Sequence, residues 1–237
     1  MERYKVCVLG GSGFVGAEIC RLAVAMGHEV VSVSRGGRPD LDEPWLEGVT
    51  WVSANVLDPQ EWTDHLQGCE ALVHSVGIAN EEPDDRQTFQ QVHRDSARLA
   101  AEAAEMAGVP KFVFLSAAKV PPSLPHAYLQ SKLDAEATLQ ASGLNVAILR
   151  PVHVCDSQDL HGEPTSDGAL ATTGMAAGVM AAAAAASSPL QQWTEQTPGL
   201  RRERVAMAAL RAALQPETLG VLEVAEIAHL GDAMFIQ

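Results

Sequence analysis

Basic residues, aromatic residues and cysteines are all scarce in this chain of 237 residues. Lysine and arginine number 16 against 30 aspartates and glutamates, so the formal net charge at pH 7 is −14. A surface of that sign repels the phosphates of nucleic acids and of anionic lipid headgroups, so we expect neither as a partner. Soluble partners or small ligands fit this charge better. The hydrophobic content of 47% suits a packed core and argues against a disordered chain.

The few cysteines are scattered along the chain, at positions 7, 20, 69 and 155, without a C-x-x-C pair. They indicate neither a zinc site nor a disulfide framework, and a reducing compartment fits them. His74, His126 and His153 do not stand at the spacing of a metal-binding motif such as H-E-x-x-H. We therefore predict no metal site and interpret these histidines as loop or core residues.

Long runs of large apolar side chains are also missing. The longest uncharged stretch, residues 168–194, could span a bilayer by length but consists mostly of alanine, glycine, serine and threonine. We interpret it as a helix and loop packed on the domain rather than as an integral membrane segment, although Gly174-x-x-x-Gly178 is a close-packing motif in membrane helices. The first expected strand begins within four residues of Met1, so we expect no signal or transit peptide in the sequence as given. We expect a cytoplasmic protein, or one from an organelle interior (mitochondrion or plastid) if the chain is a processed form.

Short apolar runs recur along the chain with helical patterns between them, which predicts an α/β fold with a Rossmann-type doubly wound parallel sheet. Most of the runs lack polar alternation, as expected of strands that helices cover on both faces. The expected strands are Lys5–Leu9, Glu29–Ser34, Thr50–Ser53, Ala71–Ser75, Lys111–Ser116 and Asn145–Leu149. The expected helices between them are Phe14–Met26, a short piece at Asp42–Glu47, Pro59–Leu66, Arg86–Ala107 and Tyr128–Ala141.

The character of the sequence changes after Pro151, where a loop precedes the alanine-rich stretch. Beyond it we expect a helix at Arg201–Leu214, a short strand at Gly220–Val224 and a last helical turn or two at Ala225–Leu230. We therefore predict a Rossmann domain over residues 1–152. Residues 153–237 would form a small C-terminal substrate or docking lobe, packed on the same domain over the carboxyl edge of the sheet, where open α/β folds bind ligands.

A glycine-rich segment, Gly10-Gly11-Ser12-Gly13-Phe14-Val15-Gly16, joins the first expected strand to the first expected helix. The first glycine of the motif permits a tight turn, the second lets the backbone approach a pyrophosphate, and the third lets helix and strand pack closely. A glycine pattern alone predicts only a flexible turn. Here the strand, turn and helix stand in the required order at the start of the domain, so we predict that this turn binds a nicotinamide dinucleotide.

The end of the second expected strand bears on which dinucleotide is bound. An acidic residue usually contacts the adenosine ribose at this place, about 20 residues beyond the glycine turn. This chain has Ser34-Arg35 there, with Arg38 nearby. A hydroxyl followed by a guanidinium can bind a 2′-phosphate through charge-assisted hydrogen bonds, which favours NADP(H) over NAD(H). NAD(H) stays open, because Arg35 could equally be a solvated loop residue.

Several segments together resemble a known family. They are the glycine turn, His74-Ser75-Val76-Gly77, Phe114-Leu115-Ser116, Tyr128-Leu129-Gln130-Ser131-Lys132 and Leu149-Arg150-Pro151, in this order. Over about Lys5–Val154 the chain resembles the extended and atypical short-chain dehydrogenases/reductases. More narrowly, it is similar to the branch that contains the nucleotide-binding accessory subunit of respiratory complex I.

The resemblance implies a catalytic role for three side chains. Tyr128 and Lys132 would lie one turn apart on the same face of a helix. In the family, the tyrosine donates or accepts the proton, while the lysine lowers its pKa and holds the nicotinamide ribose. Ser116 would orient the substrate carbonyl. A tyrosine and lysine without a shared role, and a serine that only closes a turn, are the structural alternatives.

The resemblance also implies further contacts to the cofactor. Asn55 and Val56 stand where relatives have Asp-Val beside the adenine, Ser75, Val76 and Gly77 would lie beside the nicotinamide, and Pro151 and Val152 would flank its amide.

Two functions from different classes follow. The leading hypothesis is an NADP(H)-dependent oxidoreductase, or an epimerase/dehydratase-like enzyme that oxidises its substrate transiently, acting on a small molecule of unknown identity. The alternative is a non-catalytic nucleotide-binding accessory or assembly subunit of a respiratory or quinone-related complex, in which residues 168–188 form a docking surface. A homodimer and docking to a larger complex are both compatible with the sequence.

Overall fold

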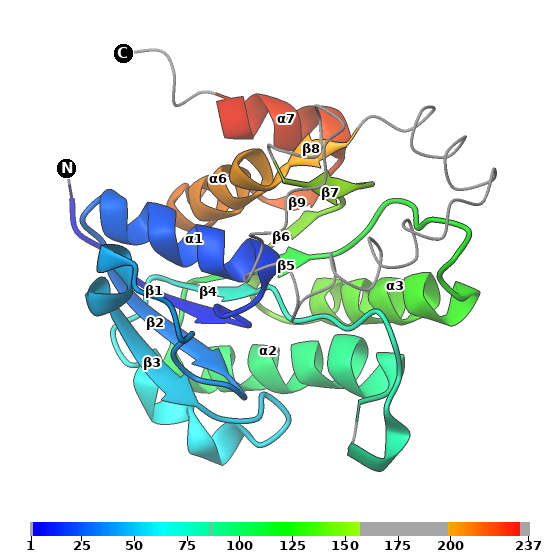
Figure 1. Ribbon diagram of the computed structural model, residues 1–237, viewed down its shortest axis with the longest axis horizontal. Helices are drawn as coiled ribbons and strands as arrows, with labels where there is room; N and C mark the ends of the chain where they lie inside the picture. Colours follow the sequence, from blue (N-terminus) through cyan, green and yellow to red (C-terminus); the bar gives the residue numbers. More distant parts are fainter. Residues whose placement is uncertain (1, 86, 157–198, 233–237) are drawn as a thin grey trace.

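The computed structural model describes residues 2–85, 87–156 and 199–232 (Figure 1). Its centre is a parallel sheet of seven strands in the order β3-β2-β1-β4-β5-β6-β9. The strands are β1 (Lys5–Leu9), β2 (Glu29–Ser34), β3 (Val49–Ser53), β4 (Ala71–His74), β5 (Lys111–Leu115), β6 (Asn145–Leu149) and β9 (Gly220–Leu222). Strands β2 and β3 lie on one side of β1, and β4, β5 and β6 lie on its other side, as in a doubly wound sheet. The expected Rossmann-type α/β fold is therefore confirmed.

Helices cover both faces of this sheet (Figure 1). On one face lie α1 (Phe14–Ala25) and α6 (Arg202–Leu214), with α7 (Val224–Asp232) packed against α6. On the other lie α2 (Ser96–Ala107) and α3 (His126–Gln140). Within β1, Val6 and Val8 pack towards α1 and α6, whereas Cys7 and Leu9 pack towards α2. Both faces of the strand are buried, which explains why its sequence is continuously apolar.

The connections differ more from expectation than the strands do. The expected pieces at Asp42–Glu47 and Pro59–Leu66 are short 3-10 helices, at Pro44–Gly48, Pro59–Glu61 and Thr63–Leu66. Proline at the first position of a segment permits a helical start, but pieces this short hold only one turn or so. The expected helix Arg86–Ala107 begins later than expected: Gln87 pairs with Glu82 in an isolated β-bridge, and a π-helical segment, Gln90–Asp95, precedes α2. Arg86 lies outside the described residues.

The described C-terminal residues belong to the body of the sheet. Strand β9 pairs in parallel with β6, and β7 (Val154–Cys155) pairs with β8 (Leu200–Arg201) in a separate small sheet. We expected residues beyond Pro151 to lie over the carboxyl edge of the sheet. Helix α6 instead covers one face of the sheet, and nearly all its side chains from Val205 to Ala213 are buried. The boundary near residue 152 stays a prediction. Residues 157–198, which include the alanine-rich stretch with Gly174 and Gly178, lie outside the described residues.

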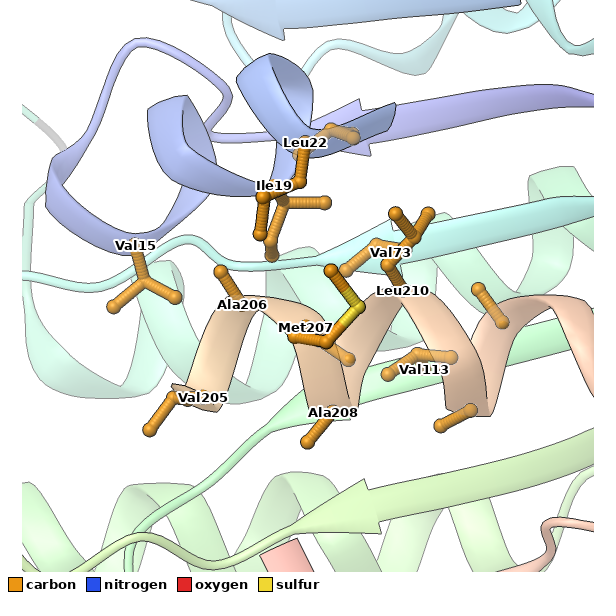
Figure 2. Close-up of a cluster of buried hydrophobic side chains, with 14 of the residues drawn as sticks. Val15, Ile19, Leu22, Val73, Val113, Val205, Ala206, Met207, Ala208 and Leu210 are labelled. Carbon is orange, nitrogen blue, oxygen red and sulfur yellow. The ribbon is translucent and has the colours of Figure 1, made fainter. Parts of the chain in front are cut away.

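Figure 2 shows how α6 is held. Its side chains Val205, Ala206, Met207 and Leu210 pack in one cluster with Val15, Ile19 and Leu22 of α1 and with Val73 and Val113 of the sheet.

In residues 2–85, 87–156 and 199–232, no helix has both the length and the apolar character to cross a membrane. The four cysteines are free and buried.

Candidate functional site

A cavity of about 710 Å³ lies at the carboxyl edge of the sheet, among the turns that follow β1, β2, β3, β4, β5 and β6. This is where doubly wound folds bind their ligands, and the volume is within the usual range for small-molecule sites. Nearly all the expected site residues line it. They are Gly10, Ser12, Gly13, Phe14, Val15, Ser34, Arg35, Asn55, Val56, Ser75, Val76, Gly77, Ser116, Tyr128, Lys132, Pro151 and Val152. Gly11 and Gly16 lie behind this wall.

Three glycines of the turn, Gly10, Gly11 and Gly16, each have a structural reason to be glycine. Gly10 adopts a φ of +83°, which side chains disfavour, and its amide donates to the carbonyl of Val33 at 2.8 Å. A Cβ on Gly16 would overlap the carbonyl oxygen of Gly10, and a Cβ on Gly11 would overlap the hydroxyl of Ser32. Gly11 and Gly16 therefore serve close packing.

The N-terminus of α1 faces this cavity, and no side chain in the described part of the molecule caps it. Gly13 is the N-cap residue, and the first turn holds no acidic side chain. The first amides of a helix have no partner within it and form its positive end. Phe14 and Val15, whose amides belong to this turn, line the cavity. The site therefore fits an anionic ligand such as a diphosphate.

Two arginines line the cavity at the end of β2, and they differ in whether another side chain pairs with them. Arg38 forms an ion pair with Glu47 at 2.6 Å. Arg35 is exposed, and within the described part of the chain its guanidinium has no hydrogen bond or ion pair. Ser34 is buried, and its hydroxyl donates to the carbonyl of Gly37 at 3.3 Å. Arg35 is thus available to an anion.

Asn55 lines the cavity at the end of β3, but its side chain already has a local partner. Its Oδ1 accepts the amide of Leu57 at 3.1 Å, so the side chain closes its own turn. The Nδ2 group remains the part of Asn55 that could donate to a ligand.

The opposite end of the cavity holds Tyr128 and Lys132, both on α3 and almost fully buried. The Tyr128 ring makes edge contacts with Phe89 and His93, at centroid distances of 5.5 and 4.9 Å. Burial raises the pKa of Tyr128 well above its ordinary value. The phenol is therefore protonated at neutral pH.

The ammonium group of Lys132 reaches two strand ends. Its Nζ donates to the carbonyl of Leu115 at 2.9 Å and to that of Val76 at 3.2 Å, and it lies 5.0 Å from the ring centroid of Phe114. Burial lowers the pKa of Lys132 to about 7, which the charge of Glu136 opposes. We expected this lysine to lower the pKa of Tyr128. In the structure burial raises the pKa of the tyrosine, and the expected effect of the lysine stays a prediction.

Ser116 lies just beyond β5, where it was expected, but its hydroxyl proton is already used. The hydroxyl donates to the carboxylate of Glu136, which is buried and also accepts from Arg150. Arg150 makes a second ion pair with Glu223 at 3.0 Å. A serine that orients a substrate carbonyl must donate its proton to that carbonyl. The expected role of Ser116 therefore stays a prediction that requires this hydrogen bond to break.

Sequence reasoning missed His93 and Glu136. The Nε2 of His93 accepts the amide of Ile78 at 3.3 Å, so its proton lies on Nδ1, 2.8 Å from the Ser131 hydroxyl. Burial lowers the pKa of His93 well below its ordinary value, which keeps the ring neutral. Glu136 could have been found, because it follows Lys132 by one helical turn. His93 could not, since its position depends on the π segment.

The comparisons with known proteins identify the family of the chain. A model of the NAD(P)H-binding family matches residues 10–188. An uncharacterized chloroplastic protein of Arabidopsis thaliana is 37% identical over 163 residues, which cover 67% of this chain and 53% of that protein. The MIOREX complex component 2 of Saccharomyces cerevisiae is 28% identical over 184 residues, 57% of this chain and 66% of that protein. The chain thus spans about half to two thirds of the length of these two relatives.

Solved structures show the same fold. The Bordetella bronchiseptica enzyme WbmH in complex with NAD+ is 20% identical with a TM-score of 0.63, covering 93% of this chain and 74% of that one. A short-chain dehydrogenase/reductase superfamily protein from Agrobacterium tumefaciens with bound NAD is 19% identical with a TM-score of 0.64, covering 93% and 77%.

Proposed function

The chain belongs to the NAD(P)H-binding family within the short-chain dehydrogenase/reductase superfamily, and on that premise we propose that it is an NADP(H)-dependent oxidoreductase with Tyr128 as its acid and Lys132 as the supporting cation. The observation that carries the proposal is one cavity that joins three features. These are a helix N-terminus and an Arg35 guanidinium for which the described residues supply no side-chain cap and no ion-pair partner, and a buried tyrosine and lysine one turn apart.

The cofactor would lie along this cavity from β2 to β6. Main-chain amides at the start of α1 would hold the diphosphate, and Arg35 with Ser34 would hold the 2′-phosphate of the adenosine ribose. Lys132 would hold the nicotinamide ribose with the third donor of its ammonium group, since two donors bind the carbonyl oxygens of Val76 and Leu115. When bound, the dinucleotide supplies a hydride to the substrate or removes one from it.

In the proposed reaction Tyr128 is the proton donor, and the burial that raises its pKa keeps the phenol protonated but also makes it a weaker acid. A phenol that stays protonated at neutral pH is suited to donate a proton to a carbonyl oxygen as this oxygen gains negative charge. The ammonium of Lys132, one turn away, would stabilise the phenolate that remains. We therefore propose that the protein reduces a carbonyl to an alcohol.

A Tyr128→Phe variant tests the acid. We expect NADPH to bind it as it binds the wild type, because the phenol is not among the groups that hold the diphosphate or phosphate. Its carbonyl-dependent NADPH oxidation should fall by a factor of about 10² or more, the usual contribution of a positioned acid. Binding is measured by calorimetry and turnover by absorbance. Unchanged turnover would remove Tyr128 from the mechanism.

An Arg35→Ala variant tests the preference for NADP(H). A charge-assisted hydrogen bond contributes about 1.5–3 kcal/mol, so the affinity for NADPH should fall roughly tenfold to a hundredfold, while that for NADH stays unchanged. The control is Arg98→Ala, which removes an exposed arginine paired with Glu102 on α2. An unchanged ratio of the two affinities in Arg35→Ala would reject the 2′-phosphate site.

A second candidate is the non-catalytic accessory or assembly role. The observation that favours it is Ser116, whose hydroxyl proton is held by Glu136 rather than left for a substrate. Relatives support it as well: the photosystem II assembly factor Ycf39 of Synechocystis is 31% identical over 113 residues, 47% of this chain and 33% of that protein. The chloroplastic relative of Arabidopsis supports an organelle interior. Tightly bound NADPH that no carbonyl compound oxidises, together with stable co-purification of a larger complex, would favour this role over the enzyme.

A further inference from the structure

Apolar side chains from three separate turns line the cavity that Tyr128 also lines. Ile78 follows β4, Val120 and Leu124 follow β5, and Val152 and Val154 follow β6. We call these five residues the apolar end of the cavity. All five are half-buried, and Ile78, Val120 and Leu124 pack around the buried cluster of Phe89, Ala117 and Tyr128. A ligand that covers them gains the free energy of removing apolar surface from water.

The charged groups at this end do not suit an anionic substrate. Besides Lys132, Lys119 is the one cationic side chain that lines it among the described residues, and it is exposed. Asp85 also lines the cavity, in an exposed loop with Glu81, Glu82 and Asp84. A sugar nucleotide would require cations for its diphosphate, and a carboxylate in the cavity would be repelled by Asp85 and by the acidic loop to which it belongs.

We propose that the substrate is an uncharged ketone with an alkyl body, whose carbonyl lies at Tyr128 and whose chain covers the apolar end of the cavity. This rests on the proposed oxidoreductase function and adds the substrate class to it. The carbonyl carbon accepts the hydride, with its two electrons, from the reduced dinucleotide. The carbonyl oxygen takes the phenolic proton of Tyr128, and the phenolate recovers a proton from solvent. The product is a secondary alcohol.

Binding distinguishes this substrate from the others without depending on turnover. The full chain, saturated with NADP+, is titrated in a calorimeter with decanone, with decanoate and with UDP-glucose. We expect decanone to bind, and the two anionic probes to bind at least about tenfold more weakly, because each would place an unpaired charge at an apolar wall. Tighter binding of UDP-glucose or decanoate would overturn the proposal, and so would the absence of binding by all three.

Substitutions at Leu124 locate the binding site. Leu124→Asp should weaken decanone binding about tenfold or more by placing a charge in the apolar end, and Leu124→Ala should weaken it less, since it only removes contact area. The matched control is Leu133→Asp, because Leu133 is an exposed leucine of α3 that does not line the cavity. If both Leu124 variants take up NADP+ and bind decanone like the wild type, the proposed site is wrong.

The two proposals fail in different ways. If well-folded wild-type protein did not bind NADP+, the proposed function and this inference would both be wrong. Uptake of NADP+ without binding of decanone would overturn the substrate class alone, leaving the cofactor site in place.

Discussion

Lys132 places a cation in the interior, so its protonation must affect folding as well as chemistry. Burial lowers its pKa to about 7 from an ordinary value of 10.5. Below pH 7 both the folded and unfolded chains carry the proton, whereas between about pH 7 and 10 mainly the unfolded chain does. The stability contribution of this residue is therefore full above the unfolded pKa and is lost as the pH falls towards 7.

A comparison with Lys132→Met measures this effect. From pH 7 to 9 the free energy of unfolding of the wild type should rise relative to that of Lys132→Met, by up to about 1.4 kcal/mol per pH unit for one proton. The variant also loses two hydrogen bonds to carbonyls, but that loss does not depend on pH. Urea unfolding at several pH values gives the difference. Parallel pH profiles for the two proteins would show that the lysine keeps its ordinary pKa.

Ser116 and His93 show what the sequence reveals at the level of single residues. The resemblance placed Ser116 at the correct point, just beyond β5, and its proximity to the cavity followed from that placement. Its hydrogen bond to Glu136 could not follow, because that contact depends on the rotamers of two buried side chains. His93 is held by an amide from the turn after β4 and by a hydroxyl from α3, and neither contact can be assigned without coordinates.

At the scale of the elements, a substitution in the glycine turn should affect both the packing of α1 and the binding of NADPH. A Cβ on Gly16 would overlap the carbonyl oxygen of Gly10, and neither backbone can retreat without moving α1 or the turn. We expect Gly16→Ala to lower the melting temperature and to abolish NADPH binding, because the first amides of α1 would be displaced. Overpacking of this kind costs about 1–3 kcal/mol or more.

The control for this variant is Gly143→Ala. A Cβ on Gly143 would meet only a side-chain oxygen of Glu105, at an ordinary contact distance of 3.7 Å, so both stability and binding should stay close to the wild type. Differential scanning fluorimetry and calorimetry measure the two properties. If Gly16→Ala bound NADPH normally, close packing of α1 on the turn would not be what positions the amides.

The strands could be predicted because burial on both faces makes their sequences continuously apolar. The long helices could be predicted from the helical spacing of their apolar residues. Expected and observed bounds of β1, β2 and β6 are the same, and α1 and α3 differ from expectation by one or two residues. The connections could not be predicted as well. The π segment Gln90–Asp95 has no periodicity of its own, and its extra residue turns His93 towards Tyr128.

At the scale of the whole molecule, the C-terminal residues were placed least well. The helix in Arg202–Leu214 was expected, but not the sheet face that it covers, because an alanine-rich helix buried nearly all round carries little indication of direction. In the structure it completes the cluster beneath α1, whose N-terminus faces the cavity (Figure 2). The segment expected as a lobe thus supports the turn that would bind the diphosphate.

This arrangement predicts that residues 1–152 do not fold alone. Val205, Met207 and Leu210 are buried against α1 and the sheet. At about 1.5–3 kcal/mol for each buried side chain, removing them would cancel a large part of a typical stability of about 5–15 kcal/mol. We expect a chain ending at residue 152 to lack a cooperative thermal transition and to bind no NADPH.

A substitution within the full chain separates the loss of α6 packing from the loss of the other residues. Leu210→Asp keeps every residue from 153 onward but places a charge against the buried cluster, so it should destabilise the protein strongly and weaken NADPH binding in proportion to the unfolded fraction. Circular dichroism on heating, with and without NADPH, measures both. A cooperative transition in the chain ending at residue 152, with NADPH raising its midpoint, would show instead that the nucleotide-binding part is a domain in its own right. In that case α6 would be an addition to a complete fold, and Leu210→Asp should then leave NADPH binding intact.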